Sequence, residues 1–332
     1  MNFQIVNAKL SILTLSLILF SCEHGRSFKY ENNSNKKESS KRIEIFYESM
    51  RAGELEPCCC KNNPMGGLPR LKSLVNKTRK QNPRTLLING GGLYLPARIL
   101  EDIDQKKALY KAEAMSKLYN NLRPDFVLFS PDERRYESVL KRTSDNHQFV
   151  SYADFKNLSK KEFGTRLKDK KAGWTSFKLE PGLTLALAHL IDVNQDNKTE
   201  LLEILKKEKP EAELYLFLYY GSIDNLESIL KELPRIDLVL LSSERRVLFT
   251  EAIINDTPVI NSGFKGRYIS NFIIEFDKNK KLPLKKASKG HMSYRYSAIA
   301  LKDNYEDDQE IKKEIESFKE SEAEKIKLWE KK

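Results

Sequence analysis

Three consecutive cysteines are the most reactive side chains in this sequence. Cys58, Cys59 and Cys60 lie in the segment E-P-C-C-C-K-N-N-P-M-G-G-L-P-R, which ends where a helical pattern of apolar residues begins. The thiolate is the form of cysteine that attacks electrophiles and binds metals, and the positive end of a nearby helix favours it. Three thiolates can hold Cu(I) or, with one further ligand, Zn²⁺. The segment therefore predicts a thiol site, either redox-active or binding a soft metal.

The spacing of these cysteines favours one pair over the others. A disulfide between adjacent cysteines is strained, because a single peptide bond fixes the separation of their Cα atoms. We therefore expect Cys58 and Cys60 to share a metal or a disulfide and Cys59 to be less important. The alternative is an inert loop whose cysteines are buried or permanently bridged. No haem-attachment motif of the form C-x-x-C-H is present.

The fourth cysteine, Cys22, follows a segment that is typical of an export signal. Residues 1–10 contain one charge, on Lys9, and an apolar run over residues 10–20 ends at Ser21. This run is too short to span a bilayer as a helix, which takes about 20 residues. L-F-S-C resembles the lipobox of bacterial lipoproteins, in which the cysteine carries the lipid, although Phe20 departs from its strictest form.

The N-terminal pattern predicts a division into signal and tether. We expect a signal peptide over residues 1–21, a lipid on Cys22 and a polar, flexible tether over residues 22–41. The lipid would anchor the protein to a membrane of the bacterial cell envelope, on the periplasmic or the cell-surface leaflet. An ordinary signal peptide cleaved nearby is the alternative.

Charge and cysteine content narrow the partners and the sources of stability. The chain of 332 residues has a formal net charge of +11, but its lysines alternate with glutamates, as in E-I-K-K-E-I-E. Mixed charge of this kind is typical of a solvated surface, so we expect no nucleic-acid partner and leave a protein partner or a small ligand open. With its cysteines not spread along the chain, the protein has no disulfide framework and must fold on its hydrophobic core.

Apolar strand patterns alternate with helical patterns along the chain. We expect strands at residues 42–47, 84–89, 125–130, 213–219 and 237–241, and helical faces carrying Leu68, Leu71, Leu74 and Val75, and Ala108, Ala112, Met115 and Tyr119. Strands separated by helices pair mostly in parallel. Residues 272–276 and 294–301 form further strands without an intervening helix. Residues 303–332 form a C-terminal amphipathic helix that closes the fold or, alternatively, binds a partner.

The order of these segments resembles the metallophosphoesterase domain of the bacterial 5′-nucleotidase family, of the calcineurin-like fold. The matching segments are G-G-L-P-R at 66–70, R-T-L-L-I-N-G-G-G-L-Y at 84–94, D-F-V-L-F-S-P-D-E at 125–133, L-F-L-Y-Y-G-S at 216–222, I-D-L-V-L-L-S-S-E-R at 236–245 and D-T-P-V-I-N-S-G-F-K-G-R-Y at 256–268. The resemblance implies an α/β fold in which a two-sheet sandwich is flanked by helices, over residues 42–302. Exported phosphoesterase-like proteins also resemble this chain in the motif formed by Glu56, Pro57, Cys58 and Cys60.

The departures from the family concern its metal site. In the family, aspartates, histidines and an asparagine of these loops hold two divalent metals, which activate water and bind the phosphate. This sequence has Ser49 and Arg51 in the first loop, and its other corresponding residues, which we regard as vestigial, are Asn89, Gly92, Asp132, Glu133, Tyr219, Ser243 and Arg245. Glycine and arginine supply no metal ligand, so we expect no di-metal centre. His189, inside an apolar strand, is expected to be a core residue.

Three hypotheses about function follow. The first is a non-catalytic lipoprotein that uses the fold as a scaffold or a binding surface. The second is a thiol or soft-metal site at Cys58 and Cys60 built on that scaffold. The third is a metal-dependent phosphohydrolase, or 5′-nucleotidase, with an altered metal site.

Overall fold

The computed structural model describes residues 41–58, 63–94, 102–130, 133, 136, 171–191, 193–276 and 293–330. The predicted signal peptide and tether, with Cys22, lie outside these residues. So do Cys59, Cys60 and Asp132.

The first sheet combines the N-terminal strands with the last two strands of the chain. It has the order β11-β10-β1-β2-β3, with bounds β1 Lys41–Glu48, β2 Thr85–Asn89, β3 Phe126–Val127, β10 Tyr268–Phe276 and β11 Ser293–Ala300. Strands β1, β2 and β3 run parallel, whereas β10 is antiparallel to both β1 and β11. The parallel half follows from the helices that separate its strands in the sequence.

The second sheet lies in the middle of the sequence and has the order β4-β5-β6-β7-β9-β8. Its strands are β4 Ala172–Glu180, β5 Leu183–Ile191, β6 Leu214–Tyr220, β7 Leu238–Ser242, β8 Ala252–Ile254 and β9 Thr257–Ile260. The four central strands are parallel, and β4 and β8 form antiparallel edges. The two sheets and their helices confirm the predicted fold class.

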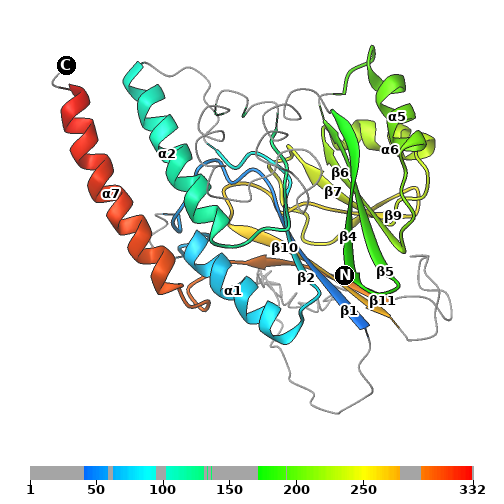
Figure 1. The fold of residues 1–332 in the computed structure, drawn as a ribbon, viewed down its shortest axis with the longest axis horizontal. Coiled ribbons are helices and arrows are strands. Elements are labelled where there is room, and N and C mark those ends of the chain that lie inside the picture. The colour runs from blue at the N-terminus through cyan, green and yellow to red at the C-terminus, as the bar shows by residue number, and fades with distance from the viewer. Residues whose placement is uncertain are drawn as a thin grey trace, which may run out of the picture. The chain divides into compact units, whose positions relative to one another are not determined.

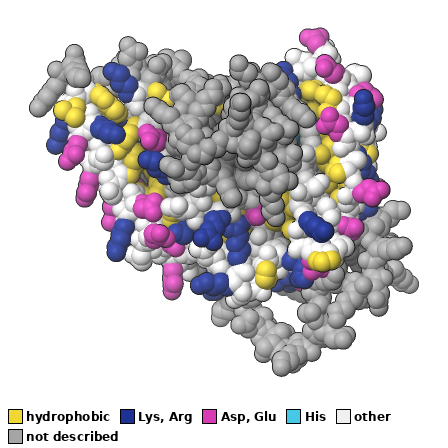
Figure 2. Space-filling model, in the orientation of Figure 1, with side chains coloured by type: hydrophobic (Ala, Val, Ile, Leu, Met, Phe, Trp, Pro, Cys, Tyr) yellow, Lys and Arg dark blue, Asp and Glu magenta, His cyan; other side chains and the backbone are white. Residues whose placement is uncertain are grey.

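Helices cover the outer faces of the two sheets (Figure 1). Beside the first sheet lie α1 (Leu68–Gln81), α2 (Asp102–Asn120) and α7 (Gln309–Glu330), and beside the second lie α5 (Lys198–Lys207) and α6 (Ile223–Glu232). On the face shown in Figure 2, basic and acidic side chains are interspersed along the helices, as expected for a solvated surface. Among the helices that the structure describes, none is long and apolar enough to cross a membrane.

The alternation of side chains along the strands produces two hydrophobic cores. In β6, Leu216 and Leu218 belong to the large core that the two sheets share, whereas Phe217 and Tyr219 belong to a second core under α5 and α6. His189 is completely buried on the inner face of β5, and its ring centroid lies 6.4 Å from that of Phe126 in the opposite sheet. This placement agrees with the expected core histidine.

The C-terminal helix α7 packs against α1 and α2. Ile311 and Ile315 are buried, and Phe318 stacks on Tyr110 of α2 with 4.8 Å between the ring centroids. Lys72 of α1 forms an ion pair with Glu310, at 2.7 Å. The helix therefore continues the layer that covers the first sheet.

One strand is shorter than its sequence pattern suggests. The apolar run at 125–130 predicts six residues of strand, but β3 contains only Phe126 and Val127. After the bond from Leu128 N–H to Asn89 O, the chain leaves the ladder, and Ser130 turns toward Glu133. The rest of the apolar run is buried although it does not pair with a neighbouring strand, so its apolar character does not by itself indicate a strand.

Candidate functional site

The loops after the parallel strands of both sheets meet at one edge of the sandwich. The Tyr47 hydroxyl at the end of β1 donates to Leu241 O at the end of β7, at 2.8 Å. Ser49 N–H donates to the hydroxyl of Ser262, after β9, at 2.9 Å. In open parallel sheets, ligands bind outside the carboxyl ends of the strands. This edge, which we call the strand-end cluster, is therefore the candidate functional site.

Unusual backbone conformations gather in the strand-end cluster. Four of its non-glycine residues have φ values in the left-handed region, between 52° and 69°: Met50, Ala52, Ser243 and Lys265. Such conformations are costly for residues with a Cβ atom and persist only where the surrounding structure holds them. Here Met50 N–H donates to Gly91 O and Met50 O accepts from Lys265 N–H, so three loops hold one another.

A completely buried ion pair forms the centre of this cluster. The guanidinium of Arg51 donates from Nη2 to Glu48 Oε2 at 2.6 Å and from Nε to Glu48 Oε1 at 3.2 Å. Its Nη1 donates to Glu54 O at 3.0 Å. Burial lowers the pKa of Arg51, but the charge and hydrogen bonds of Glu48 outweigh that effect, so the pKa is raised. Arg51 is therefore a permanent buried cation.

The loop after β9 closes over this cation. Gly266 has a φ of 59°, and a Cβ atom added there would lie 2.6 Å from Arg51 Cζ. That separation is far below any real contact, so only glycine allows the backbone to lie against the guanidinium. The glycine thus links the Arg51 side chain to the position of the closing loop.

Glu133 has a different environment within the cluster. Its carboxylate accepts hydrogen bonds from the backbone N–H groups of Gly92, Tyr94 and Ser130, at 3.1, 3.0 and 2.9 Å, and from the Ser130 hydroxyl at 2.7 Å. Burial raises the pKa of Glu133, although these hydrogen bonds oppose the shift. The carboxylate therefore joins the loops after β2 and β3 instead of facing solvent.

The hydroxyl groups of the cluster are also held within the protein. Tyr47 OH lies 2.6 Å from Ser242 Oγ, and burial raises the pKa of Tyr47 well above its ordinary value. Ser243 Oγ donates to Gly221 O at 3.0 Å. The hydrogen bonds of these hydroxyl groups therefore crosslink the loops.

The structure brings together only some of the residues that the sequence singles out. Asn89 is completely buried and its Oδ1 accepts from Gly91 N–H at 2.9 Å, in the same cluster as Gly92, Glu133 and Ser243. Arg245 is exposed beyond the cluster. Tyr219 points to the outer core, whereas its neighbour Tyr220 packs toward the inner one, as expected for consecutive residues of a strand.

The cysteine loop lies beside this cluster and is closed at its base. Cys58 N–H donates to Met65 O at 2.9 Å, Met65 N–H donates to Cys58 Sγ at 3.4 Å, and Pro57 pairs with Gly66. A Cβ atom on Gly66 would lie 3.0 Å from Gly266 O, so this base contacts the loop that covers Arg51. Cys58 is partly exposed.

The described residues of the cluster do not fit a two-metal centre. Divalent metals require several carboxylates or imidazoles that converge with free lone pairs. Glu48 is already paired with a guanidinium, Glu133 accepts four hydrogen bonds, and Asn89 Oδ1 accepts from the backbone. In the part of the chain that the structure describes, no three His, Cys, Asp or Glu side chains are grouped to hold an ion.

Several residues of the cluster were not predicted from the sequence. Glu48, Tyr47, Asn261 and Ser262 all lie at strand ends and are buried. The sequence did contain one signal of the ion pair. Glu48 ends an apolar strand and Arg51 follows three residues later, and charged residues so close to a core are usually paired. The partnership of Tyr47 with Ser242 joins residues 195 positions apart, and no local pattern indicates it.

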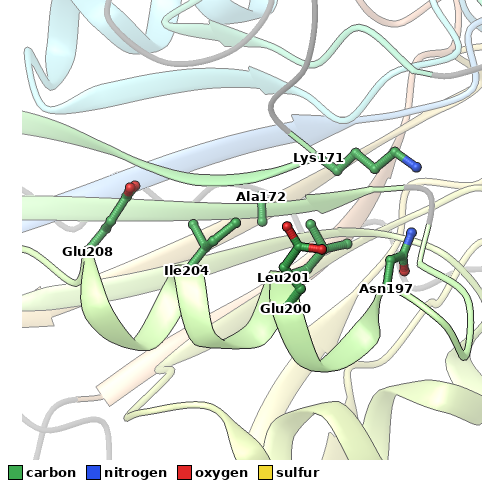
Figure 3. Close-up of a pocket in the computed structure, with 7 residues that line it drawn as sticks. All are labelled: Lys171, Ala172, Asn197, Glu200, Leu201, Ile204 and Glu208. Carbon is green, nitrogen blue, oxygen red and sulfur yellow. The ribbon is translucent and has the colours of Figure 1, made fainter.

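A separate hollow lies on the far side of the second sheet. It encloses about 310 Å³ between β4 and α5 and is lined by Lys171, Ala172, Asn197, Glu200, Leu201, Ile204 and Glu208. In Figure 3, the carboxylates of Glu200 and Glu208 extend from the helix at different points along it. Both are exposed, so the hollow is a shallow feature of the surface and is distinct from the strand-end cluster.

With this geometry, the chain has the fold of calcineurin-like phosphoesterases and 5′-nucleotidases. It is similar to the NAD nucleotidase of Haemophilus influenzae, with a TM-score of 0.62 and 12% identity over 85% of this chain and 60% of that one. It is similar to a calcineurin-like phosphoesterase of Bacillus subtilis, with a TM-score of 0.60 and 14% identity over 87% of this chain and 100% of that one. It is also similar to a 5′-nucleotidase precursor of Thermus thermophilus, with a TM-score of 0.60 and 13% identity over 84% of this chain and 59% of that one. The chain thus spans about three fifths of the two nucleotidases. No family model and no curated protein matches its sequence.

The buried ion pair leads to a prediction about stability. Arg51→Met leaves the Glu48 carboxylate buried without a counter-charge, so we expect a loss of about 3–5 kcal/mol in the free energy of unfolding. The double variant Glu48→Gln with Arg51→Met removes that charge and should lose less than Arg51→Met alone. Urea unfolding of the purified variants measures both quantities.

Arg295→Met is a matched control for this measurement. Arg295 forms an ion pair with Glu275 at the same 2.6 Å, but its side chain is 64% exposed. Exposed pairs contribute about 0–1 kcal/mol, so this variant should unfold almost as the wild type does. Equal losses from Arg51→Met and from the double variant would show that the packing of the side chain matters and its charge does not.

Proposed function

We propose that this chain is a lipid-anchored protein of the bacterial cell envelope that uses a phosphoesterase fold as a non-catalytic scaffold or binding surface. The observation that carries the proposal is the Glu48–Arg51 pair, which lies completely buried where the strand ends meet. A positive charge built from the chain itself stabilises the loops there. Such a centre has no need of a bound cation.

The chemistry of the strand-end cluster supports the absence of hydrolysis. Hydrolysis of a phosphate ester requires an activated water and positive charge that reaches the phosphate. Arg51 is sealed under Gly266, and its raised pKa keeps it protonated, so it cannot act as a base. Glu133 is only 3% exposed and is held by four hydrogen bonds, so it cannot reach a water in solvent. None of these groups is available to a substrate.

The proposed attachment to a membrane rests on the N-terminal sequence. The apolar run before Cys22 and the L-F-S-C segment favour processing at that cysteine, and the polar residues 23–41 would separate the folded domain from the lipid. A single acyl chain binds membranes only weakly, so stable anchoring requires more than one chain. The proposal therefore includes a multiply acylated Cys22.

A second candidate function is a thiol or soft-metal site at the cysteine loop. The closure between Cys58 and Met65 favours it, because it holds the Cys58 sulfur at a fixed and partly exposed position. Lys61 and Arg70 lie close in sequence and would favour the thiolate. Cys60, two residues on, would complete the pair for a disulfide or a metal.

The anchor can be tested by phase partition. The full-length protein should enter a detergent phase, and Cys22→Ser should remove this behaviour because the tether has no other apolar segment. Cys58→Ser is the matched control, since it also removes one thiol and should still partition as the wild type does. Sedimentation of the Cys22→Ser protein with membranes would contradict the proposed anchor.

The lack of catalysis can be tested by assay of the purified protein. Hydrolysis of nucleotides and aryl phosphates should stay at background when Mn²⁺, Mg²⁺, Zn²⁺ or Co²⁺ is supplied, because the described ligands are already paired. A metal-dependent turnover that Asp132→Ala abolishes and the exposed control Asp303→Ala leaves unchanged would overturn the proposal. It would favour a phosphohydrolase with an altered metal site instead.

The cysteine loop can be tested by thiol titration with and without reductant, together with metal analysis. We expect a soft metal or a reversible disulfide that Cys58→Ser and Cys60→Ser remove and that Cys59→Ser retains. Three reduced, metal-free and unreactive thiols would rule out a functional loop. Equal effects of the three substitutions would indicate a site of three thiolates instead of a Cys58–Cys60 pair.

A further inference from the structure

The loop over residues 243–251, between β7 and β8, presents two adjacent arginines to solvent. We call it the arginine loop. Arg245 and Arg246 are both exposed, and within the described part of the chain neither forms an ion pair. Several basic side chains on the helices do have an acidic partner, such as Lys206 with Glu203. The guanidinium groups of Arg245 and Arg246 are therefore available to an acceptor from outside the chain.

An aromatic ring supports the first of these arginines. The guanidinium carbon of Arg245 lies 5.1 Å from the ring centroid of Phe264, within the range of a cation–π contact. Lys265 Nζ lies 5.8 Å from the same centroid, but Lys265 is paired with Glu54 at 2.7 Å. Of the two cations at this ring, only Arg245 therefore has its charge available. A guanidinium on a ring keeps its planar fork of donors free for a carboxylate.

The same loop exposes a large apolar side chain. Phe249 is 62% exposed, although its ring contacts Tyr268 edge-on with 5.4 Å between the centroids. The side chain is therefore held in position from below and open above. Aromatic residues and arginine are the residue types most enriched in the energetically important centres of protein interfaces.

Hydrogen bonds from both sheets fix the arginine loop. Asn261 Nδ2 donates to Glu244 O, and Asn261 O accepts from Leu248 N–H, each at 3.1 Å. Leu248 O accepts from the hydroxyl of Tyr296. Glu251 accepts from the hydroxyl of Tyr294, at 3.1 Å. A loop that is already ordered loses little conformational entropy when it binds.

We infer that the arginine loop, with Phe264, is a docking surface for an acidic segment of a partner protein. Carboxylates of the segment would accept hydrogen bonds from Arg245 and Arg246, and an apolar or aromatic residue would cover Phe249. This inference rests on the proposed binding function and names the chemistry of the partner. It concerns the exposed rim beyond the strand-end cluster, not the buried ion pair.

The number and setting of the charges favour a protein segment over other anions. Surfaces that recognise anionic lipid carry clusters of about four to eight basic residues, and nucleic acid requires many phosphate contacts. Here the arginine loop contains only Arg245 and Arg246, each without an ion pair among the described residues, which is fewer basic residues than such surfaces carry. Two carboxylates spaced along a peptide, with an aromatic residue between them, match this pattern better.

Fluorescence anisotropy with a labelled peptide of alternating Glu and Tyr tests the inference on the full mature chain. Arg245→Gln with Arg246→Gln should weaken binding by about tenfold, which corresponds to the loss of two partly exposed charge pairs. Phe249→Ser should weaken it independently. Lys312→Gln with Lys313→Gln removes the same charge from exposed positions on α7 and should leave the affinity unchanged.

The outcomes separate the inference from its alternatives. No binding of the peptide by the wild type, or equal weakening by the α7 control, would overturn it. So would binding to vesicles containing phosphatidylserine, or to a single-stranded oligonucleotide, that exceeds peptide binding and is lost in the arginine variant. Metal-dependent phosphatase turnover would contradict the proposed function but would leave a positive peptide result, and hence the docking surface, in place.

Discussion

The pairing of Glu48 with Arg51 is the interaction on which the strand-end cluster depends. Two ions removed from water are costly, and a buried pair is stable only when its geometry is good and its remaining donors are satisfied. Arg51 meets this condition with two bonds to Glu48 and one to Glu54 O. The same requirement restricts the loop after β9 to glycine at position 266, because no side chain fits against the guanidinium. One ion pair thus constrains the ends of both sheets.

This constraint has consequences for the whole edge of the sandwich. Left-handed backbone at Met50, Ala52 and Lys265 is costly, and the hydrogen bonds among their loops compensate for it. Glu133 performs an equivalent task for the loops after β2 and β3, with its carboxylate as the common acceptor. An edge organised in this way by internal charges presents its outer residues, such as those of the arginine loop, as a rigid surface. A loop that is already ordered loses little conformational entropy on binding, which favours the proposed role in recognition.

Local patterns in the sequence predicted several of the elements and the fold class, but not β4, β8, α5 and α6. Period-two alternation located β1, and short apolar runs located β6 and β7, each within a residue or two. The helical face of Leu68, Leu71 and Val75 became the buried face of α1. The apolar pattern was less informative at the end of β3, because the residues after Val127 are buried but do not pair with a neighbouring strand. Only the structure places Tyr219 and Tyr220 against different cores, because neighbouring residues of a strand occupy opposite faces.

The residue types alone led to the prediction that Gly92, Ser243 and Arg245 supply no ligands to a di-metal centre, because that prediction needs chemistry and no coordinates. They did not reveal what holds the loops together instead. The pairing of Tyr47 with Ser242, the burial of Arg51 under Gly266 and the position of Phe264 beneath Arg245 all join segments far apart in the chain. Such contacts form between loops that only the folded sheets bring together, and no local periodicity records them. The energy of a buried charge depends on all of its surroundings, so it emerges only after the chain has folded.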